Sequence, residues 1–575
     1  MRHNKFIYGM MAAATLLAAS CTDFDDYNQA YQTGSAESNV TLWGNISSRS
    51  DLSEFASLLV KGGFDKELDK SRFYTVWAPK NGTFDFATYN QMDSATLVDR
   101  FIKSNVADFN YVLSSSFNER VHALNEKSYT FQNENGSTYD ENKVVTANIP
   151  NVNGTLHITE GAAVYRPNIY EFIFDHAEEG VDTSLAVYLK KYETAYLDLE
   201  NSIPGPIDTL GRQTYSDSVI IVENDMINQM RALIDDEDSL YTMFVPTEEA
   251  YETTYKKISS YYRYADVTNY YPVLNDGPAK STTAIDDYDS DYLTDSLASW
   301  YLAKDLVVSH HNGYNYWLDE VDGPQPAVFD TLLTTTFDKL SHAEDFIART
   351  VGEPQRMSNG YVRMVDSLAY LPWEVWCPEI NVNFINDPST YMPYFKDCVG
   401  NTMEVPYNMF NSALGDYIPY YVDFVPSGDR SQPEAYFMLP NVRSTKYNVY
   451  VVFVPSNVMS SAAESGDKPL QFEAEISYVS DEDGGTDEFD FDGTEFVLDG
   501  ERLNRIDTFL LGEMEFPYAY AYVDEEGDCM PYLHLSVKRS SKSDREKYTN
   551  EMRIAGVILR PVEYDQFLIK EDESL

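Results

Sequence analysis

Short runs in which apolar and polar residues alternate fill the C-terminal part of the chain, from about Ile380 onward. Alternation over about four to eight residues is typical of a half-buried β-strand, because successive side chains point to opposite faces of a sheet. Turn residues separate the runs, and short strands at this spacing favour an antiparallel β-sandwich over residues 380–575. The expected strands are 436–439, 446–454, 471–479, 508–511, 532–537 and 554–559.

The preceding part of the chain contains the same order of elements twice. An aromatic and β-branched run at 73–84 contains the turn sequence PKNG, and a second such run lies at 241–251. Apolar residues at helical spacing follow each run, and then a strand that begins with Asn-Gly. In the first copy the helical residues are Leu97, Val98, Phe101, Ile102, Val106 and Phe109, and the closing strand is 153–159. In the second copy the helix is expected at 297–311 and the closing strand at 359–366.

Both copies resemble the fasciclin family. The sequences FYTVWAPKNGTF and YTMFVPTEEAY are similar to the family's opening motif, and the two Asn-Gly strands are similar to its closing strand. The resemblance implies an α+β fold with two tandem fasciclin-like domains, at 39–176 and 183–379, and a role in adhesion or in protein and glycan contacts. Where the family often has a histidine, the first copy has Ser104-Asn105-Val106, whereas the second has His310-His311.

The C-terminal region, 380–575, is loosely similar to jelly-roll carbohydrate-binding modules. The sequence LPNV at 439–442 precedes a long expected strand, and the final strand ends with ILRPV at 558–562. This similarity implies a jelly-roll-like β-sandwich that binds glycan.

A Tyr- and Asp-rich insertion interrupts the second copy at about 259–295. Because it has little aliphatic content it cannot form a core of its own, so we expect it on a surface. Tyr518, Tyr520 and Tyr522 alternate, which would place their rings on one face of a strand. Core packing is the alternative for both groups of rings. The candidate contact residues for a ligand or partner are Tyr261, Tyr262, Tyr264, Tyr270, Tyr271, Tyr518, Tyr520 and Tyr522.

The first residues of the chain indicate an export signal. Arg2 and Lys5 precede an uncharged, mostly apolar run at 6–19 that ends in small residues, which is typical of a signal peptide over residues 1–20. The run is shorter than the ~20 apolar residues that a membrane-spanning helix needs.

The sequence LAASC, which ends at Cys21, resembles the lipobox of bacterial lipoproteins. This resemblance implies that Cys21 carries the lipid and that 21–38 is a lipidated linker; an ordinary secretory signal is the alternative. The acidic sequence TDFDD at 22–26 resembles the surface-export signal of some Gram-negative lipoproteins. We therefore expect a lipid anchor in the outer membrane and exposure at the cell surface.

The formal net charge of the 575 residues is −51 at pH 7. Nucleic acid and anionic lipid headgroups are therefore excluded as partners, because affinity for phosphates comes from Lys and Arg. Tyrosine is abundant, with 45 residues against 6 tryptophans. Its apolar ring and hydroxyl suit wet contact surfaces as well as cores.

We expect no catalytic residues, no cofactor and no metal. Neither HExxH nor GxSxG occurs, so the common zinc-protease and α/β-hydrolase signatures are absent. The acidic run at 287–292 lacks the glycine and the glutamate of an EF-hand loop, and 487–493 is interpreted as a solvated hairpin tip, with calcium binding left open. Cys377, Cys398 and Cys529 form no CxxC pair, and a bridge between the first two stays open.

These features favour a non-enzymatic surface lipoprotein for recognition or adhesion, with glycan, protein or matrix as its ligand. Family-level analogy extends this to an accessory role in a nutrient-uptake complex of the starch-utilisation type, whose partners are a barrel transporter and its lid lipoprotein. Two other classes stay open. A hydrolase in the C-terminal domain would need two carboxylates that converge in a pocket, and a purely structural subunit of an outer-membrane complex would need a large apolar face.

Overall fold

The N-terminal sheet is built around strand β1 (Tyr74–Pro79), all six residues of which are buried. β1 pairs in parallel with β7 (Gly154–Glu160), and both strands therefore have covered faces rather than the alternating burial of a surface strand. The order of the seven strands is β2 (Val106–Ala107), β1, β7, β6 (Asn142–Asn151), β5 (Thr138–Tyr139), β4 (Ser128–Gln132) and β3 (Asn118–His122).

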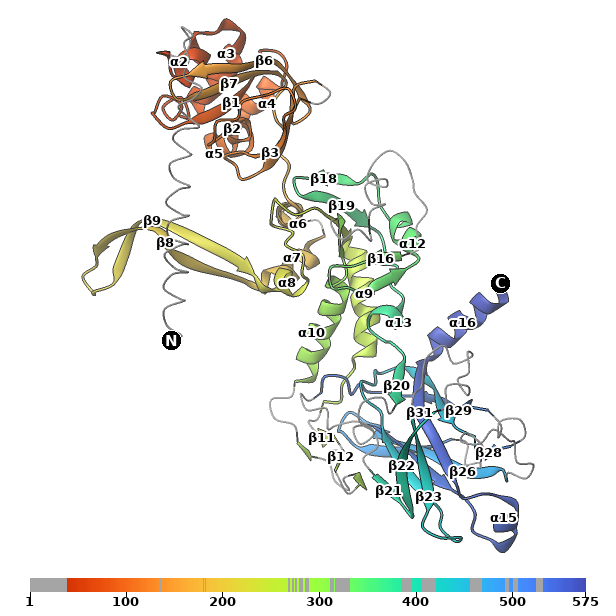
Figure 1. Cartoon of the computed structure of the whole chain (residues 1–575). Helices are drawn as coiled ribbons and strands as arrows, with labels where there is room; N and C mark the ends of the chain where they lie inside the picture. Colours follow the sequence, from red (N-terminus) through yellow and green to blue (C-terminus); the bar gives the residue numbers. More distant parts are fainter. Residues whose placement is uncertain are drawn as a thin grey trace, which may run out of the picture. The chain divides into compact units, whose positions relative to one another are not determined.

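The computed structural model describes most of the chain from residue 39 onward, in two compact units (Figure 1). The described residues are 39–133, 136–178, 180, 182–266, 269–270, 273–274, 277–278, 283–284, 289–310, 315, 331–383, 394–405, 420–455, 468–491, 496–499, 505–523 and 531–574. The first unit comprises the described parts of Met1–Glu179, Leu233–Met243 and Pro354–Val362, and the second comprises the described remainder.

Short helices cover one side of the N-terminal sheet. Thr41 caps the first of them by accepting a hydrogen bond from the Gly44 amide, as expected of a threonine at a helix N-terminus. Leu58, Phe101 and Leu156 are among the fully buried residues of the core between helices and sheet. The helices are α2 (Leu42–Ser48), α3 (Ser53–Lys61), α4 (Phe86–Gln91) and α5 (Ser94–Leu97). A wider π-helical segment, η3 (Val98–Ile102), and a tighter 3-10 segment, η4 (Lys103–Asn105), continue α5.

The helical segment expected at 97–109 is shorter than the spacing of its apolar residues predicted. Helical residues end at Asn105, and Val106 begins β2, where it pairs with Val76. In the second copy, helix α10 (Ser290–Ala303) likewise ends before Val307. The prediction of helix at Val106, Phe109 and Val307 is therefore wrong, because edge-strand pairing replaces the last helical turn in each copy.

The second copy forms a four-stranded sheet in which β10 (Tyr241–Pro246) is as deeply buried as β1. The order of its strands is β15 (Val307–Ser309), β10, β19 (Gly360–Val365) and β18 (Gln355–Met357). Its other main elements are α7 (Thr183–Lys190), β8 (Glu193–Ile207), β9 (Gln213–Asn224), α8 (Asp225–Gln229), α9 (Glu248–Tyr261), β16 (Thr331–Leu333), β17 (Lys339–Ser341), α12 (Ala343–Ala348) and α13 (Pro372–Val375). Helix α6 (Ile169–Glu178) precedes them and belongs to the first unit.

The two Asn-Gly strands begin with the same hydrogen bonds. Asn153 accepts a bond from the Tyr74 amide through its carbonyl oxygen at 3.1 Å, and Asn359 accepts one from the Tyr241 amide at the same distance. The amide Nδ2 of each asparagine donates to two carbonyl oxygens of the segment before the opening strand, Leu68 and Lys70 in the first copy and Ile234 and Asp236 in the second. These asparagines therefore tie the opening and closing strands together in both copies.

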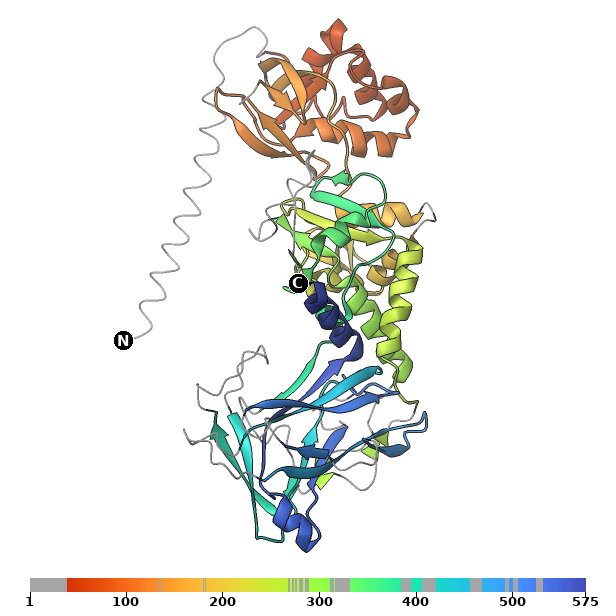
Figure 2. The same ribbon diagram turned by 90° about the vertical axis from the view of Figure 1, so that its right-hand side faces the viewer.

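Two antiparallel sheets make up the C-terminal region (teal to blue in Figure 2). Phe424 lies 6.3 Å from Phe437 and Phe453 lies 5.1 Å from Phe472, so the sheets face each other through aromatic rings. One sheet has the order β22 (Cys398–Glu404), β23 (Tyr420–Pro426), β31 (Met552–Pro561), β25 (Lys446–Phe453) and β29 (Asp507–Glu515), with β20 (Ile380–Asn383) also on β31. The other has the order β21 (Tyr394–Lys396), β24 (Glu434–Met438), β30 (Tyr532–Val537), β26 (Leu470–Val479) and β27 (Thr486–Asp490), with β28 (Phe496–Leu498) also on β26. The six expected runs overlap β24, β25, β26, β29, β30 and β31, whereas β20 to β23, β27 and β28 were not expected.

Two helices complete the C-terminal region, α15 (Lys542–Lys547) and α16 (Val562–Ser574). Across the residues that the structure describes, every helix is too short or too polar to cross a lipid bilayer.

Candidate ligand-binding face

One face of the second C-terminal sheet carries partly exposed aromatic and acidic side chains. In β30, Leu533 and Leu535 are buried whereas Tyr532 and His534 are half-buried, as the alternation of a strand requires. In β24 the buried residues are Ala435 and Phe437, which leaves Glu434, Tyr436 and Met438 on the opposite face. The leucines and the phenylalanine face the first C-terminal sheet. The tyrosines and His534 therefore lie on the outer surface of the second sheet.

Strand register aligns these outer side chains in a row across the sheet. Tyr436 pairs with Tyr394 on one side and with His534 on the other. His534 pairs in turn with Glu475, and Glu475 pairs with Asp490. Directly opposed residues of antiparallel strands have their Cβ atoms about 5 Å apart, so the row is continuous over five strands.

The rings of this row pack against one another. Tyr436 stacks on His534, with ring centroids 4.2 Å apart and planes 1° from parallel. Tyr394 and Tyr532 flank Tyr436 at centroid distances of 5.4 and 5.9 Å. We call the surface formed by Tyr394, Glu434, Tyr436, Glu475, Tyr532 and His534 the tyrosine face.

Carboxylates lie on both sides of the imidazole of His534, and the hydrogen bond is to Glu475. Glu475 Oε1 lies 2.5 Å from Nδ1, and Glu434 Oε2 lies 3.5 Å from Nε2. Lys396 donates to the other oxygen of Glu434 at 3.1 Å, and this bond raises the pKa of the lysine. Burial and the two glutamates raise the pKa of Tyr436 well above its usual value, so its hydroxyl stays protonated.

The tyrosine face offers flat apolar rings beside charged hydrogen-bond acceptors. Such rings can stack on the C–H face of a sugar, while carboxylates accept hydrogen bonds from hydroxyl groups. β13 (Gly277–Pro278), from the Tyr- and Asp-rich insertion, lies against β21, the strand that carries Tyr394. The insertion therefore reaches one edge of this face.

Three tyrosines predicted to be exposed contact residues are in fact buried. Tyr262 donates to the carbonyl oxygen of Trp376 at 3.0 Å, and Tyr264 donates to that of Ala521 at 2.6 Å. Tyr261 lies at the end of α9 and is also buried. The expectation of a surface position for these rings is wrong, because they pack between the helices of the second copy and the C-terminal strands.

Tyr518, Tyr520 and Tyr522 do not share one face of a strand. β29 ends at Glu515, and Pro517 follows, which has no amide proton for a sheet ladder. Tyr520 is buried, Tyr518 is half-buried, and Tyr522 is exposed with a positive φ of 64°. The predicted row of rings is therefore wrong.

Of the other residues singled out from the sequence, the structure describes some but not all. Tyr270 lies in the short strand β11 (Asn269–Tyr270), whereas Tyr271 and Cys21 lie outside the described residues. Cys377 and Cys398 are both free thiols.

The structure describes part of each acidic run. Asp289 caps α10 by accepting a hydrogen bond from the Tyr292 amide. Of the run at 487–493, residues 487–490 lie in β27 and pair with β26, so the prediction of a hairpin tip is wrong for them, and 492–493 lie outside the described residues. Within the described part of the chain, no three His, Cys, Asp or Glu side chains are arranged to hold a metal ion.

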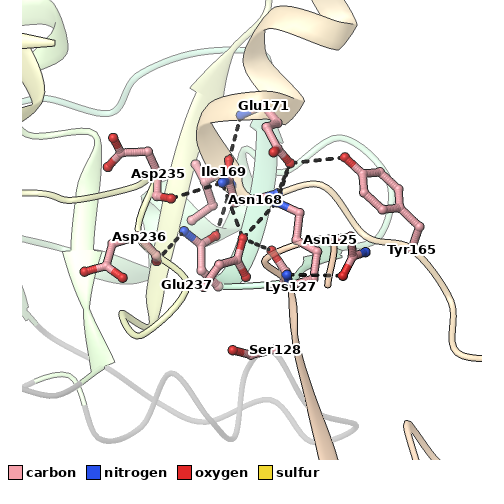
Figure 3. Close-up of polar contacts among 12 residues, drawn as sticks. Asn125, Lys127, Ser128, Tyr165, Asn168, Ile169, Glu171, Asp235, Asp236 and Glu237 are labelled. Atoms are coloured by element: carbon pink, nitrogen blue, oxygen red, sulfur yellow. Dashed lines mark hydrogen bonds and ion pairs between the residues drawn. The ribbon is translucent and has the colours of Figure 1, made fainter. Parts of the chain in front are cut away.

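A second polar cluster lies in the first unit, around the buried Lys127 (Figure 3). The ammonium of Lys127 lies 2.6 Å from Glu171 Oε2 and 2.8 Å from Glu237 Oε1. Asn168 and Ser358 also donate to Glu237. Because these charged and polar groups bond to one another, we interpret the cluster as one that stabilises the first unit rather than as a ligand site.

The residues of the tyrosine face were not among the sequence candidates. Their signal was present, since Tyr532 and His534 alternate with Leu533 and Leu535 and therefore share the face of the strand opposite the leucines. The pairing of β24, β30 and β26, which brings them together, could not be taken from that run alone.

Comparison with known protein families identifies one domain within the chain. The fasciclin domain model matches residues 50–162. Among curated proteins, no sequence matches the chain.

Three solved structures show low similarity. A fasciclin domain pair from the insect cell adhesion molecule fasciclin I is 11% identical with a TM-score of 0.19, and the match covers 56% of this chain and 98% of that one. The carbohydrate-binding and catalytic modules of Clostridium thermocellum xylanase 10B, complexed with xylohexaose, are 13% identical with a TM-score of 0.19 over 32% of this chain and 28% of that one. The extracellular domain of Arabidopsis thaliana ANXUR1 is 15% identical with a TM-score of 0.16 over 30% and 40%. The chain thus spans under half of the length of the xylanase and of ANXUR1, and its residues 50–162 are a fasciclin domain.

Proposed function

We propose that this chain is a non-enzymatic recognition or adhesion protein whose tyrosine face binds a glycan. Fasciclin domains are typical of adhesion-type proteins, and residues 50–162 form one. The observation that carries the glycan proposal is the aligned row of Tyr394, Tyr436 and His534, partly exposed on a sheet and bordered by carboxylates. A sheet holds such side chains more rigidly than a loop does, which lowers the entropy cost of binding.

The domain organisation belongs to the same proposal. We propose tandem fasciclin-like domains at 39–176 and 183–379, followed by a jelly-roll-like β-sandwich at 380–575. The shared hydrogen bonds of Asn153 and Asn359 support the tandem arrangement. The two facing antiparallel sheets support the sandwich.

We also propose that residues 1–20 are a signal peptide and that Cys21 anchors the protein to the outer face of an outer membrane. A barrel transporter and its lid lipoprotein are the proposed membrane partners. Metabolic labelling with a fatty acid tests the anchor: Cys21→Ala should lose the label and detergent partitioning, whereas the matched variant Cys398→Ala should keep both. Label retained by Cys21→Ala would contradict the anchor.

Binding to soluble neutral polysaccharides, measured one at a time by affinity electrophoresis and calorimetry, tests the glycan proposal. Tyr436→Ala and Tyr532→Ala should each lower affinity about five- to thirtyfold, since loss of a stacking ring costs ~1 to 2 kcal/mol. Tyr292→Ala is the control, because Tyr292 is an exposed tyrosine on α10 and is not one of the residues of the tyrosine face. No binding by the parent protein, or equal losses in the control, would contradict the proposal.

A carboxylate-dependent hydrolase is the second candidate, and one observation favours it. Glu434 and Glu475 lie on opposite sides of the His534 imidazole, as two acids near one site would. Each carboxylate is already engaged, Glu434 by Lys396 and Glu475 by His534, which favours a binding role. New reducing ends released from a bound polysaccharide, and lost in Glu475→Gln, would establish the hydrolase instead.

A further inference from the structure

A long β-hairpin, formed by β8 and β9, is inserted between α7 and α8 (Figure 1). The two strands pair from Glu193 with Asn224 to Ile207 with Gln213. In the described residues no further strand joins this two-stranded sheet, so each strand has one outer edge without a neighbouring strand. We call residues 193–224 the arm.

The arm exposes aliphatic side chains along its length. On β9 these include Val219, Ile220 and Val222, and on β8 they include Leu199 and Ile203. An isolated two-stranded ribbon is at best marginally stable in water, and an exposed apolar edge pairs readily with another chain. Six or more aliphatic side chains exposed on a hairpin therefore indicate a surface that another molecule covers.

The two edges of the arm are not equivalent. β8 contains Pro204 and Pro206, which have no amide proton, and its pairing shifts in register three times beyond Asp198. β9 has no proline, and its segment from Val219 to Asn224 pairs without a shift. The edge of β9 is therefore the one that can accept a further strand.

The charge of the arm limits the chemistry of its partner. Its 32 residues contain six acidic side chains and a single basic one, Arg212, which is paired with Asp208 at 3.0 Å. Asp217 and Glu223 flank the apolar sequence VIIV at 219–222. A second copy of the chain would bring the same negative charge to the contact, so like-charge repulsion disfavours a homodimer through this edge.

We propose that the edge of β9 docks a β-strand of a different protein, with apolar β-branched residues opposite 219–222 and Lys or Arg residues at both flanks. Main-chain hydrogen bonds would supply affinity, and the basic flanks would supply selectivity against neutral or acidic strands. This interaction goes beyond glycan recognition, because it involves neither the tyrosine face nor the fasciclin domain.

The test uses the full chain and two fluorescent peptides, measured by fluorescence anisotropy. One peptide has the sequence KTVIVTK, and the other has the same core with glutamate at both ends. The basic peptide should bind at least about tenfold more tightly at low ionic strength, and this preference should shrink in about 1 M salt, where the Debye length falls to about 3 Å. Equal affinity for the two peptides would overturn the proposal without reference to any variant.

A matched pair of variants locates the binding. Val222→Thr keeps the β-branched shape but removes apolar surface, and it should lower the affinity for the basic peptide about fivefold. Val399→Thr is the control, because Val399 lies on the edge strand β22 and is 57% exposed, against 52% for Val222. Equal effects of the two substitutions would overturn the proposal. A dimer in sedimentation analysis that Val222→Thr dissociates would also overturn it, since the occupant would then be a second copy.

Discussion

The ring of Tyr436 lies parallel to the imidazole of His534 at a centroid distance of 4.2 Å, on neighbouring strands of one sheet. Glu475 holds the far side of that imidazole through Nδ1. The histidine therefore acts as a fixed support behind the tyrosine, and the orientation of the Tyr436 ring depends on it.

Replacement of His534 should affect glycan binding through Tyr436. His534→Ala removes the support and should lower affinity about three- to tenfold, less than Tyr436→Ala, because the tyrosine ring remains but is less ordered. His534→Phe restores a flat ring without the contact to Glu475, and it should return affinity to within about twofold. Calorimetry with the best polysaccharide ligand measures both. If His534→Phe is as weak as His534→Ala, the contact with Glu475 rather than the stack determines binding.

The sequence predicted six strands of the C-terminal region but not the tyrosine face. Alternation identified 436–439 and 532–537 as strands, and both overlap observed strands, because burial on one face of a sheet imposes a local period of two. That Tyr436 lies beside His534 depends on strand order and register, which long-range packing decides. The same limit explains Tyr262, whose burial depends on Trp376 far along the chain.

The arm was missed for a different reason. Its sequence contains VIIV at 219–222, which is typical of a buried strand, and nothing local distinguishes it from a core strand of the second copy. Exposure of these residues results from the absence of a packing partner among the described residues, which is a property of the whole fold.

Acid should weaken the fasciclin domain through His157. This side chain is fully buried against Trp77, and burial lowers its pKa to about 4, from about 6.5 in an unfolded chain. The Asn148 amide donates to Nδ1, and Nε2 donates to the Tyr111 carbonyl at 2.9 Å, so the neutral ring is the form that fits.

The sign of the effect follows from these two pKa values. Above about pH 6.5 both states are neutral and the full stability is present; as pH falls from 6.5 to 4 the unfolded chain takes up the proton first, which costs up to about 3 kcal/mol. Hydrogen exchange of peptides from β1 and β7, corrected for intrinsic rates, measures the loss. His157→Phe should be less stable at neutral pH but should show a flatter profile over this range. An unchanged slope in that variant would assign the acid sensitivity to other groups.

Removal of the Lys127 ammonium should destabilise the first unit strongly. Its side chain is only 5% exposed and lies between Glu171 and Glu237, so Lys127→Met leaves two carboxylates close together without a cation. Loss of one partner of a buried ion pair costs about 3 kcal/mol or more. Protection of amides in 125–132 against hydrogen exchange reports the change.

Two further variants separate the ion pair from general effects of the substitution. Lys143→Met should cost under about 0.5 kcal/mol, because Lys143 is 70% exposed and lies 3.9 Å from Glu160. The double variant Lys127→Met with Glu237→Gln should lose less than the sum of the single changes, since one of the two negative charges is also removed. Strict additivity would show that Lys127 and Glu237 do not interact energetically.

Gly154 and Gly360 should be equally intolerant of substitution, because they occupy the same position in the two Asn-Gly strands. Their φ angles are 145° and 141°, and a Cβ atom would lie 1.9 Å from the Tyr74 carbonyl oxygen in one and 1.8 Å from that of Tyr241 in the other. Neither backbone oxygen can move without breaking the strand pairing that each asparagine supports, so Gly154→Ala and Gly360→Ala should each cost about 3 kcal/mol or more. Gly63→Ala is the control, because its φ is also positive, at 70°, but no atom lies within 4 Å of the added Cβ; it should cost only about 1 kcal/mol. Hydrogen exchange of β1 and β10 measures the two losses separately, and a Gly360→Ala variant as stable as the control would show that the second copy does not depend on this close approach of strands.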